Sequence, residues 1–137
     1  MGSRMPLRVL VADDSPATVE GLSSALVHED GIQVAGSATK AIEALSLIDT
    51  AKPDVVLLNI QMTGHTLLSM LHLVKRATPV PTVIVLTPYP LDMLRERCLD
   101  SGADYVFPKP IDFQRVTNVL KNLATAKKSG LGKAARD

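Results

Sequence analysis

Four apolar stretches of this chain end in polar residues of types that handle phosphoryl groups and metal ions. The acidic pair Asp13 and Asp14 follows one stretch, and Asn59, Thr87 and Lys109 mark the ends of the other three. A carboxylate pair beside a phosphoryl group is repulsive unless a divalent cation bridges them, and hard oxygen ligands suit Mg²⁺. A lysine neutralises phosphoryl charge, and a hydroxyl donates a hydrogen bond to a phosphoryl oxygen. These residue types therefore indicate phosphoryl-transfer machinery.

Asn59 ends the apolar run Val55 to Leu58, at a point where the surrounding pattern leads us to expect an aspartate. An asparagine is a poor nucleophile, because the lone pair of its amide nitrogen is delocalised into the carbonyl group. The sequence therefore predicts a site with the layout of a phosphorylation switch and without its acceptor carboxylate. The loss of one negative charge also predicts weak Mg²⁺ binding, and each tenfold loss of affinity corresponds to about 1.4 kcal/mol.

Short β-rich runs alternate with stretches of helical periodicity along the chain. The runs are Leu7 to Ala12, Ile32 to Ser37, Val55 to Leu58, Thr82 to Leu86 and Asp104 to Phe107. Apolar residues at helical spacing follow each run: Val19, Leu22 and Leu26; Ala41, Leu45 and Ile48; Leu67, Leu71 and Val74; Leu91, Leu94 and Cys98; and Phe113, Val116, Leu120 and Leu123. This alternation predicts an α/β fold, with a parallel sheet covered by helices on both faces. Sites in such sheets form at the carboxyl ends of strands, where the polar residues lie.

Composition limits the possible functions. The 137 residues are 46% hydrophobic, which suits one globular domain, and 15 Lys and Arg against 14 Asp and Glu give no support for a nucleic-acid partner. Cys98 is the only cysteine, so no internal disulfide is possible. No apolar stretch approaches the roughly 20 residues that a membrane span needs, and no signal-peptide pattern is present. We therefore expect a cytoplasmic protein without a membrane partner.

The two ends of the chain differ in character from its middle. Residues 1–5 are typical of a vector-derived leader, residues 6–124 form the predicted domain, and residues 125–137 are predicted to be a flexible basic tail. The leader leaves open whether Asn59 is natural or a deliberate change from aspartate.

Several motifs together resemble the receiver domain of two-component response regulators, over about residues 7 to 124. They are Val11-Ala12-Asp13-Asp14-Ser15, Lys52-Pro53-Asp54-Val55 ahead of Asn59-Ile60-Gln61-Met62, Leu86-Thr87, and Gly102-Ala103-Asp104 ahead of Lys109-Pro110. The segment from Leu86 to Tyr105 is similar to that of free-standing receivers. The resemblance implies a flavodoxin-like, doubly wound sheet of five parallel strands in the order 2-1-3-4-5, with five helices.

The resemblance also implies roles for the site residues. Asp14 would bind Mg²⁺ directly and Asp13 largely through water, and the remaining ligands would be the amide oxygen of Asn59 and the backbone carbonyl of Gln61. Residue 59 would be the phospho-acceptor position. The implied partners are a histidine kinase or phosphotransfer protein and a downstream target protein.

A switch is implied as well. Lys109 would neutralise phosphoryl charge, and the hydroxyl of Thr87 would move when a phosphoryl group arrives. Val106 occupies the position where the family usually has an aromatic switch residue, and Tyr105 is adjacent but should face the other way by strand alternation. The output would be a change in the surface of the fourth and fifth helices and the fifth strand.

Other readings of the same residues remain open. Asp14 or Ser15 followed by Pro16 is typical of a helix N-cap with proline at the first helical position, so the acidic pair alone does not distinguish capping from metal binding. Cys98 is predicted to pack in the core, and the histidines, which share no ligand spacing, are predicted to lie on the surface: His28, His65 and His72.

Two functions fit this pattern. One is a phosphorelay receiver that cannot accept a phosphoryl group while residue 59 is asparagine, and the other is a phosphorylation-independent pseudo-receiver that binds a protein in one fixed conformation. We expect no enzyme, because no Gly-rich phosphate loop follows the first strand.

Overall fold

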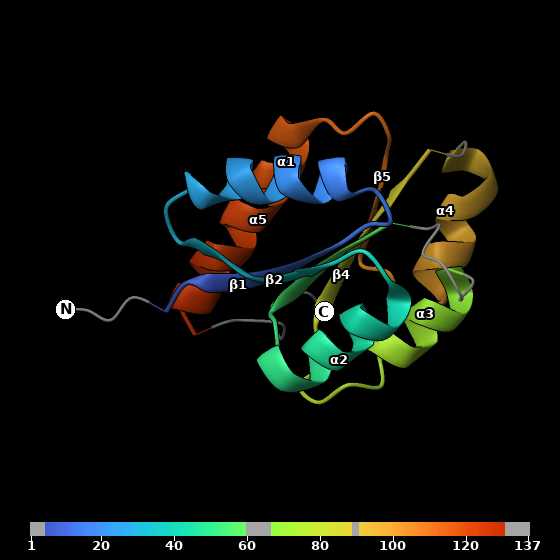
Figure 1. The fold of residues 1–137 in the computed structure, drawn as a ribbon, viewed down its shortest axis with the longest axis horizontal. Coiled ribbons are helices and arrows are strands. Elements are labelled where there is room, and N and C mark those ends of the chain that lie inside the picture. The colour runs from blue at the N-terminus through green and yellow to red at the C-terminus, as the bar shows by residue number, and fades with distance from the viewer. Residues whose placement is uncertain (1–4, 60–66, 89–90, 131–137) are drawn as a thin grey trace.

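The computed structural model describes residues 5–59, 67–88 and 91–130. In this part of the chain, five parallel strands form one sheet in the order β2-β1-β3-β4-β5 (Figure 1). The strands are β1 (Leu7–Ala12), β2 (Ile32–Ala38), β3 (Val55–Asn59), β4 (Thr82–Thr87) and β5 (Tyr105–Pro108). The helices are α1 (Pro16–Val27), α2 (Ala41–Ala51), α3 (Leu67–Val74), α4 (Leu91–Asp100) and α5 (Phe113–Lys128). The predicted flavodoxin-like class and the strand order are confirmed.

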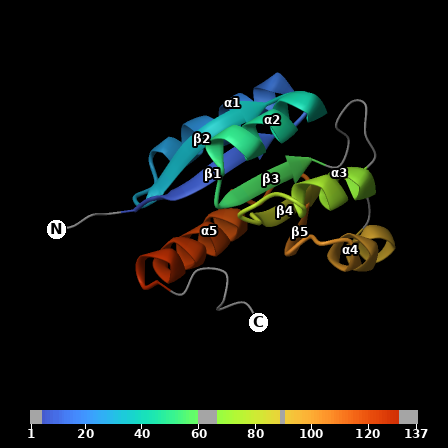
Figure 2. The same ribbon diagram turned by 90° about the horizontal axis from the view of Figure 1, so that it is seen from below.

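Helices cover both faces of the sheet, as Figure 1 and Figure 2 show from two sides. Each face has its own apolar cluster. Helices α1 and α5 pack on one face, and α2, α3 and α4 pack on the other. Every residue of β3 and β4 is buried, which explains why these runs are continuously apolar. Along β1, successive side chains enter opposite clusters: Val9 and Val11 face α1 and α5, whereas Leu10 and Ala12 face α2 and α3.

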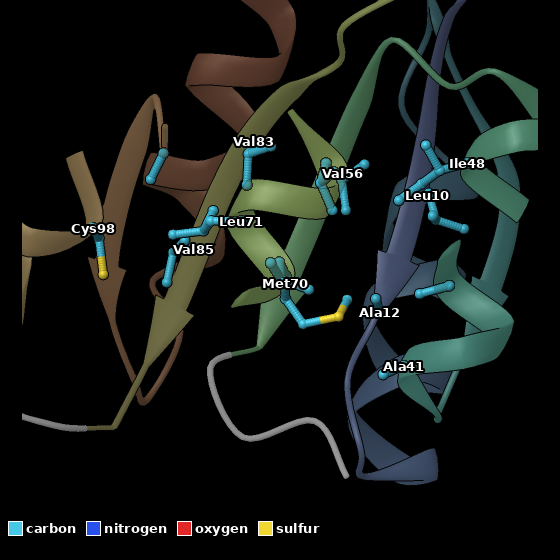
Figure 3. Packing of buried hydrophobic residues seen from close by; sticks show 14 of the residues in the cluster. Leu10, Ala12, Ala41, Ile48, Val56, Met70, Leu71, Val83, Val85 and Cys98 are labelled. Atoms are coloured by element: carbon cyan, nitrogen blue, oxygen red, sulfur yellow. The ribbon is translucent and has the colours of Figure 1, made fainter. Parts of the chain in front are cut away.

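The cluster under α2, α3 and α4 contains residues that the helical spacing did not predict. Ala44 and Met70 are buried beside the predicted Ala41 and Leu71, because a helix packed on a sheet buries a stripe wider than one row of side chains. Cys98 is fully buried in this cluster, as predicted, and burial raises the pKa of its thiol despite the nearby charge of Arg97. Figure 3 shows Ala41, Met70, Leu71 and Cys98 of this cluster from close by.

Helix α5 is longer than the sequence predicted. It ends at Lys128, and Ser129 is its C-cap, so residues 125–128 are helical and the prediction that they belong to a flexible tail is wrong. The small and polar composition of these residues concealed a contact distant in sequence, in which Lys127 pairs with Asp54. Within the described residues, no helix is both long and apolar enough to cross a membrane.

Candidate functional site

The predicted site residues lie at the carboxyl edge of the sheet, and Asp13 lies at the centre of their contacts. Its side chain is buried, and its Oδ2 is 2.7 Å from the Nζ of Lys109. Its Oδ1 accepts a hydrogen bond from the backbone N–H of Ser15 at 2.9 Å. Asp13 follows β1 and Lys109 follows β5, so the ion pair joins the first and last strands of the chain.

Asn59 contacts the other carboxylate of the pair. Its Nδ2 donates a hydrogen bond to Oδ1 of Asp14 at 3.1 Å. Asn59 is 4% exposed at the end of β3, whereas Asp14 is exposed to solvent. The amide therefore lies below a carboxylate that remains open to a ligand from solution.

Burial and hydrogen bonding act in opposite directions on Asp13. Burial by itself would raise the pKa of its carboxyl group. The hydrogen bonds from Lys109, the backbone of Ser15 and the amide of Asn59, together with the lysine charge, outweigh burial and hold this pKa below its ordinary value. Asp13 is therefore a carboxylate at neutral pH.

Thr87 ends β4 directly beside the end of β5. It is fully buried, and its backbone carbonyl accepts a hydrogen bond from the N–H of Lys109 at 2.8 Å. This bond positions the lysine for its contact with Asp13. The structure thus brings five of the predicted site residues to one edge of the sheet: Asp13, Asp14, Asn59, Thr87 and Lys109. The sixth, Gln61, lies outside the described residues.

Capping of α1 is performed by a neighbour of the acidic pair. The Oγ of Ser15 accepts a hydrogen bond from the N–H of Thr18 at 3.3 Å, and Pro16 is the first helical residue. Asp13 supports this turn through the N–H of Ser15, and Asp14 is not the cap. The N-cap reading therefore applies to Ser15, and metal binding by the pair stays a prediction.

Val106 and Tyr105 face opposite sides of the sheet, as strand alternation predicted. Val106 is 1% exposed in the cluster under α4, whereas Tyr105 stacks on Phe107 with ring centroids 6.3 Å apart. Arg115 of α5 lies over the Phe107 ring, with 5.1 Å between its Cζ and the centroid. Arg95 of α4 donates to the backbone carbonyl of Val106 at 3.3 Å, a contact for which the sequence carries no signal.

The remaining titratable candidates among the described residues lie away from this edge. His28 and His72 are exposed, as predicted, and His65 lies outside the described residues. A groove of about 940 Å³ opens at the opposite, amino edge of the sheet, where its lining includes His28, Lys121 and Lys128. The convergence of carboxylates, amide and lysine, and not the presence of a hollow, therefore marks the candidate site.

Comparisons with known proteins agree with this geometry. The model of the response regulator receiver domain matches residues 9–121. A response regulatory protein from Yersinia pestis is 35% identical over 122 residues, which are 86% of this chain and 48% of that protein. A protein-glutamate methylesterase/protein-glutamine glutaminase from Methanospirillum hungatei is 36% identical over 106 residues, which are 76% of this chain and 30% of that protein. The chain spans about half or less of these relatives.

A solved structure also resembles this chain. The receiver domain of AraT, a response regulator from Geobacillus stearothermophilus, superposes with a TM-score of 0.78 at 25% sequence identity and covers 92% of this chain and 98% of that one. The fold, the edge at which the polar residues meet and the family match over residues 9–121 lead to one conclusion: this chain belongs to the response regulator receiver domain family of two-component signalling.

Proposed function

We propose that this chain is a phosphorelay receiver that cannot accept a phosphoryl group as it stands, because residue 59 is asparagine. The observation that carries the proposal is the position of Asn59 at the end of β3, bonded to Asp14 and close enough to Asp13 to lower its pKa. The resemblance assigns the phospho-acceptor to this position. The test is phosphoryl transfer from a small acyl phosphate to an Asn59→Asp variant.

The donor atoms at this edge fit a hard divalent cation such as Mg²⁺. Asp14 offers a solvent-exposed carboxylate, and Asp13 lies beside it. The Nδ2 of Asn59 faces Asp14 in this structure, so the side-chain amide would turn to offer its oxygen to the ion. Both oxygens of Asp13 already accept hydrogen bonds, which favours an outer-shell role for this residue. When bound, the ion would supply positive charge for the phosphoryl oxygens, with Gln61 contributing its backbone carbonyl as the resemblance implies.

The charge balance of the site makes this binding weak. The carboxylates of Asp13 and Asp14 carry two negative charges, and Lys109, 2.7 Å from Asp13, cancels one of them. An aspartate at position 59 would leave two negative charges where Asn59 leaves one. Fewer net charges attract a divalent cation less strongly.

The proposed output surface comprises α4, β5 and α5. Arg95 connects α4 to the backbone of β5, and Arg115 connects α5 to Phe107 on the same strand. A displacement of β5 would therefore move both helices. The proposed partners are a histidine kinase or phosphotransfer protein upstream and a target protein downstream, and the proposed location is the cytoplasm.

One observation favours the pseudo-receiver as a second candidate. The Nδ2 of Asn59 donates to Asp14, and Lys109 pairs with Asp13, so each carboxylate has a donor supplied by the protein itself. Such a site holds one conformation without a phosphoryl group, and a partner protein could read that conformation. Phosphorylation of the Asn59→Asp variant separates the candidates, because a pocket committed to one conformation stays unmodified.

Magnesium titration is expected to show weak binding through Asp14. Amide chemical shifts near residues 13–15 should move with a dissociation constant in the millimolar range or above, since Mg²⁺ dehydrates reluctantly and the site carries little net charge. The matched control is Asp14→Ala, in which these shifts should stay almost constant. Identical titration curves for the two proteins would remove Asp14 from the metal site.

The Asn59→Asp variant is expected to be no more stable than the unchanged protein in metal-free buffer. Asparagine and aspartate have nearly the same shape, whereas a third carboxylate beside Asp13 and Asp14 adds repulsion. Thermal unfolding followed by circular dichroism, with and without Mg²⁺, measures the difference. A clearly higher melting temperature for the variant without metal would contradict the charge balance given above.

A further inference from the structure

A second charged cluster, centred on the carboxylate of Asp54, lies at the amino edge of the sheet, opposite the candidate site. Asp54 directly precedes β3, and its Oδ2 accepts hydrogen bonds from the backbone N–H of Arg8 at 2.8 Å and from the Nζ of Lys127 at 2.7 Å. The same Nζ donates to the backbone carbonyl of Pro6 at 3.0 Å. One lysine from the last turn of α5 is thus fixed to the starts of β1 and β3.

The same arrangement recurs at the start of β5. Oδ2 of Asp104 accepts hydrogen bonds from the N–H of Val83 at 2.8 Å and from the Nζ of Lys75 at 3.0 Å, and Lys75 also donates to the carbonyl of Pro81 at 3.0 Å. Gly102 makes room for this lysine, since a Cβ there would lie 2.6 Å from the Cγ of Lys75, and its φ of +117° suits glycine. Lys75 directly follows α3, so each cluster ties the end of one helix to the sheet.

The last turn of α5 depends on the contacts of Lys127 with Asp54 and Pro6 more than the end of a well-packed helix would. The last fully buried apolar residue of α5 is Leu120, and Leu123 and Ala124 are only partly buried. The groove of about 940 Å³, which Ala124 also lines, lies between the final turns of α5 on one side and Met5 and the connection between α1 and β2 on the other. Helix ends fray where tertiary packing is absent. Lys127 is therefore the main side-chain tether of the last turn among the described residues.

We propose that the Lys127–Asp54 pair is a latch that holds the last turn of α5 on the amino edge of the sheet. With the latch closed, α5 runs to Lys128 and Ser129 is its C-cap. With the latch open, residues 125–128 lose their tether, and Ser129 and Gly130 move with them. The side chains of Lys127 and Asp54 are 23% and 32% exposed, so a competing charge from solution or from a bound protein can reach the pair.

The experiment is amide hydrogen exchange in the intact chain, read at residues 127–130 relative to amides of β1 and β4. Lys127→Met keeps most of the apolar stem and removes the charge, and Asp54→Asn keeps the shape of the acceptor. Each is expected to speed exchange in the last turn about fivefold while the strand amides change little. The double variant should add little to either single variant, because both remove the same interaction.

The matched control is Lys128→Met, which removes the neighbouring and exposed lysine of the same turn. Exchange in this control should stay within about twofold of the unchanged protein, because an exposed charge near a helix end contributes little. Equal acceleration by Lys127→Met and Lys128→Met would overturn the latch. A uniform acceleration across strands and helix in Lys127→Met would also overturn it, because the pair would then support the whole fold and not the end of α5.

Discussion

Changing Asn59 to aspartate is expected to convert a protein that takes up no phosphoryl group at residue 59 into one that does. The variant places a nucleophilic carboxylate at the end of β3, beside Asp14 and within reach of the hydrogen-bond network of Asp13. Lys109 lies at the same edge to neutralise developing charge, and Thr87 ends the neighbouring strand. Incubation with acetyl phosphate and Mg²⁺, followed by intact-mass spectrometry, should show one phosphoryl adduct on the variant.

Two controls make this result specific. The unchanged protein should remain unmodified under the same conditions, and Asn59→Asp combined with Lys109→Met should show a much smaller adduct. An adduct on the unchanged protein would mean that residue 59 is not the acceptor. An unmodified Asn59→Asp protein that still folds would favour the pseudo-receiver, because the missing nucleophile would not be the only defect of the pocket.

Replacing Lys109 with methionine is expected to destabilise the fold by about 3 kcal/mol, because it leaves the buried carboxylate of Asp13 without its ion-pair partner. The side chain of Asp13 is only 2% exposed, so water is a poor replacement for the lysine. The measurement is urea unfolding at pH 7. The matched control is the double variant Asp13→Asn with Lys109→Met, which removes the charge as well and should recover much of the loss. No recovery in the double variant would show that the methionine acts through packing.

The same variant predicts a pH dependence. In the unchanged protein the pKa of Asp13 is below its ordinary value, so its contribution to stability is present above about pH 4 and is lost as the pH falls through the folded-state pKa. In Lys109→Met the principal stabilising contact is gone, and protonation of Asp13 relieves the buried charge. The stability gap between the two proteins should therefore narrow below about pH 4. A constant difference in the free energy of unfolding down to pH 3 would show that Lys109 does not influence the ionisation of Asp13.

The sequence was sufficient for the fold because its signals are local. The apolar run before Asn59 and the alternation of runs with helical spacing each span a few residues, and a parallel sheet requires the ends of its strands to meet at one edge. The meeting of the candidate residues at one edge could be predicted for the same reason, since Asp13 follows β1 and Asn59 and Thr87 end β3 and β4.

What the sequence could not predict depends on contacts between distant residues. Asp54 and Lys127 are separated by 73 positions, and the sequence around Lys127 does not indicate that its partner is a carboxylate at the start of β3. The end of α5 was therefore placed too early. The hydrogen bond from Asn59 to Asp14 spans 45 positions and depends on how β1 and β3 pair, so the two residue types alone do not predict it.

The two ends of the described chain lie on the same side of the molecule. Met5 and Lys128 line one groove at the amino edge, and the six residues of β1, about 20 Å of strand, separate that edge from Asp13. A fluorescent protein or an affinity label attached at either end of the described residues would therefore stand clear of the acidic pair. Because the ends are close, a short linker could also join them, and new ends could be opened in an exposed loop elsewhere. Such a rearranged chain would carry a reporter beside α4 while the acidic pair kept its place.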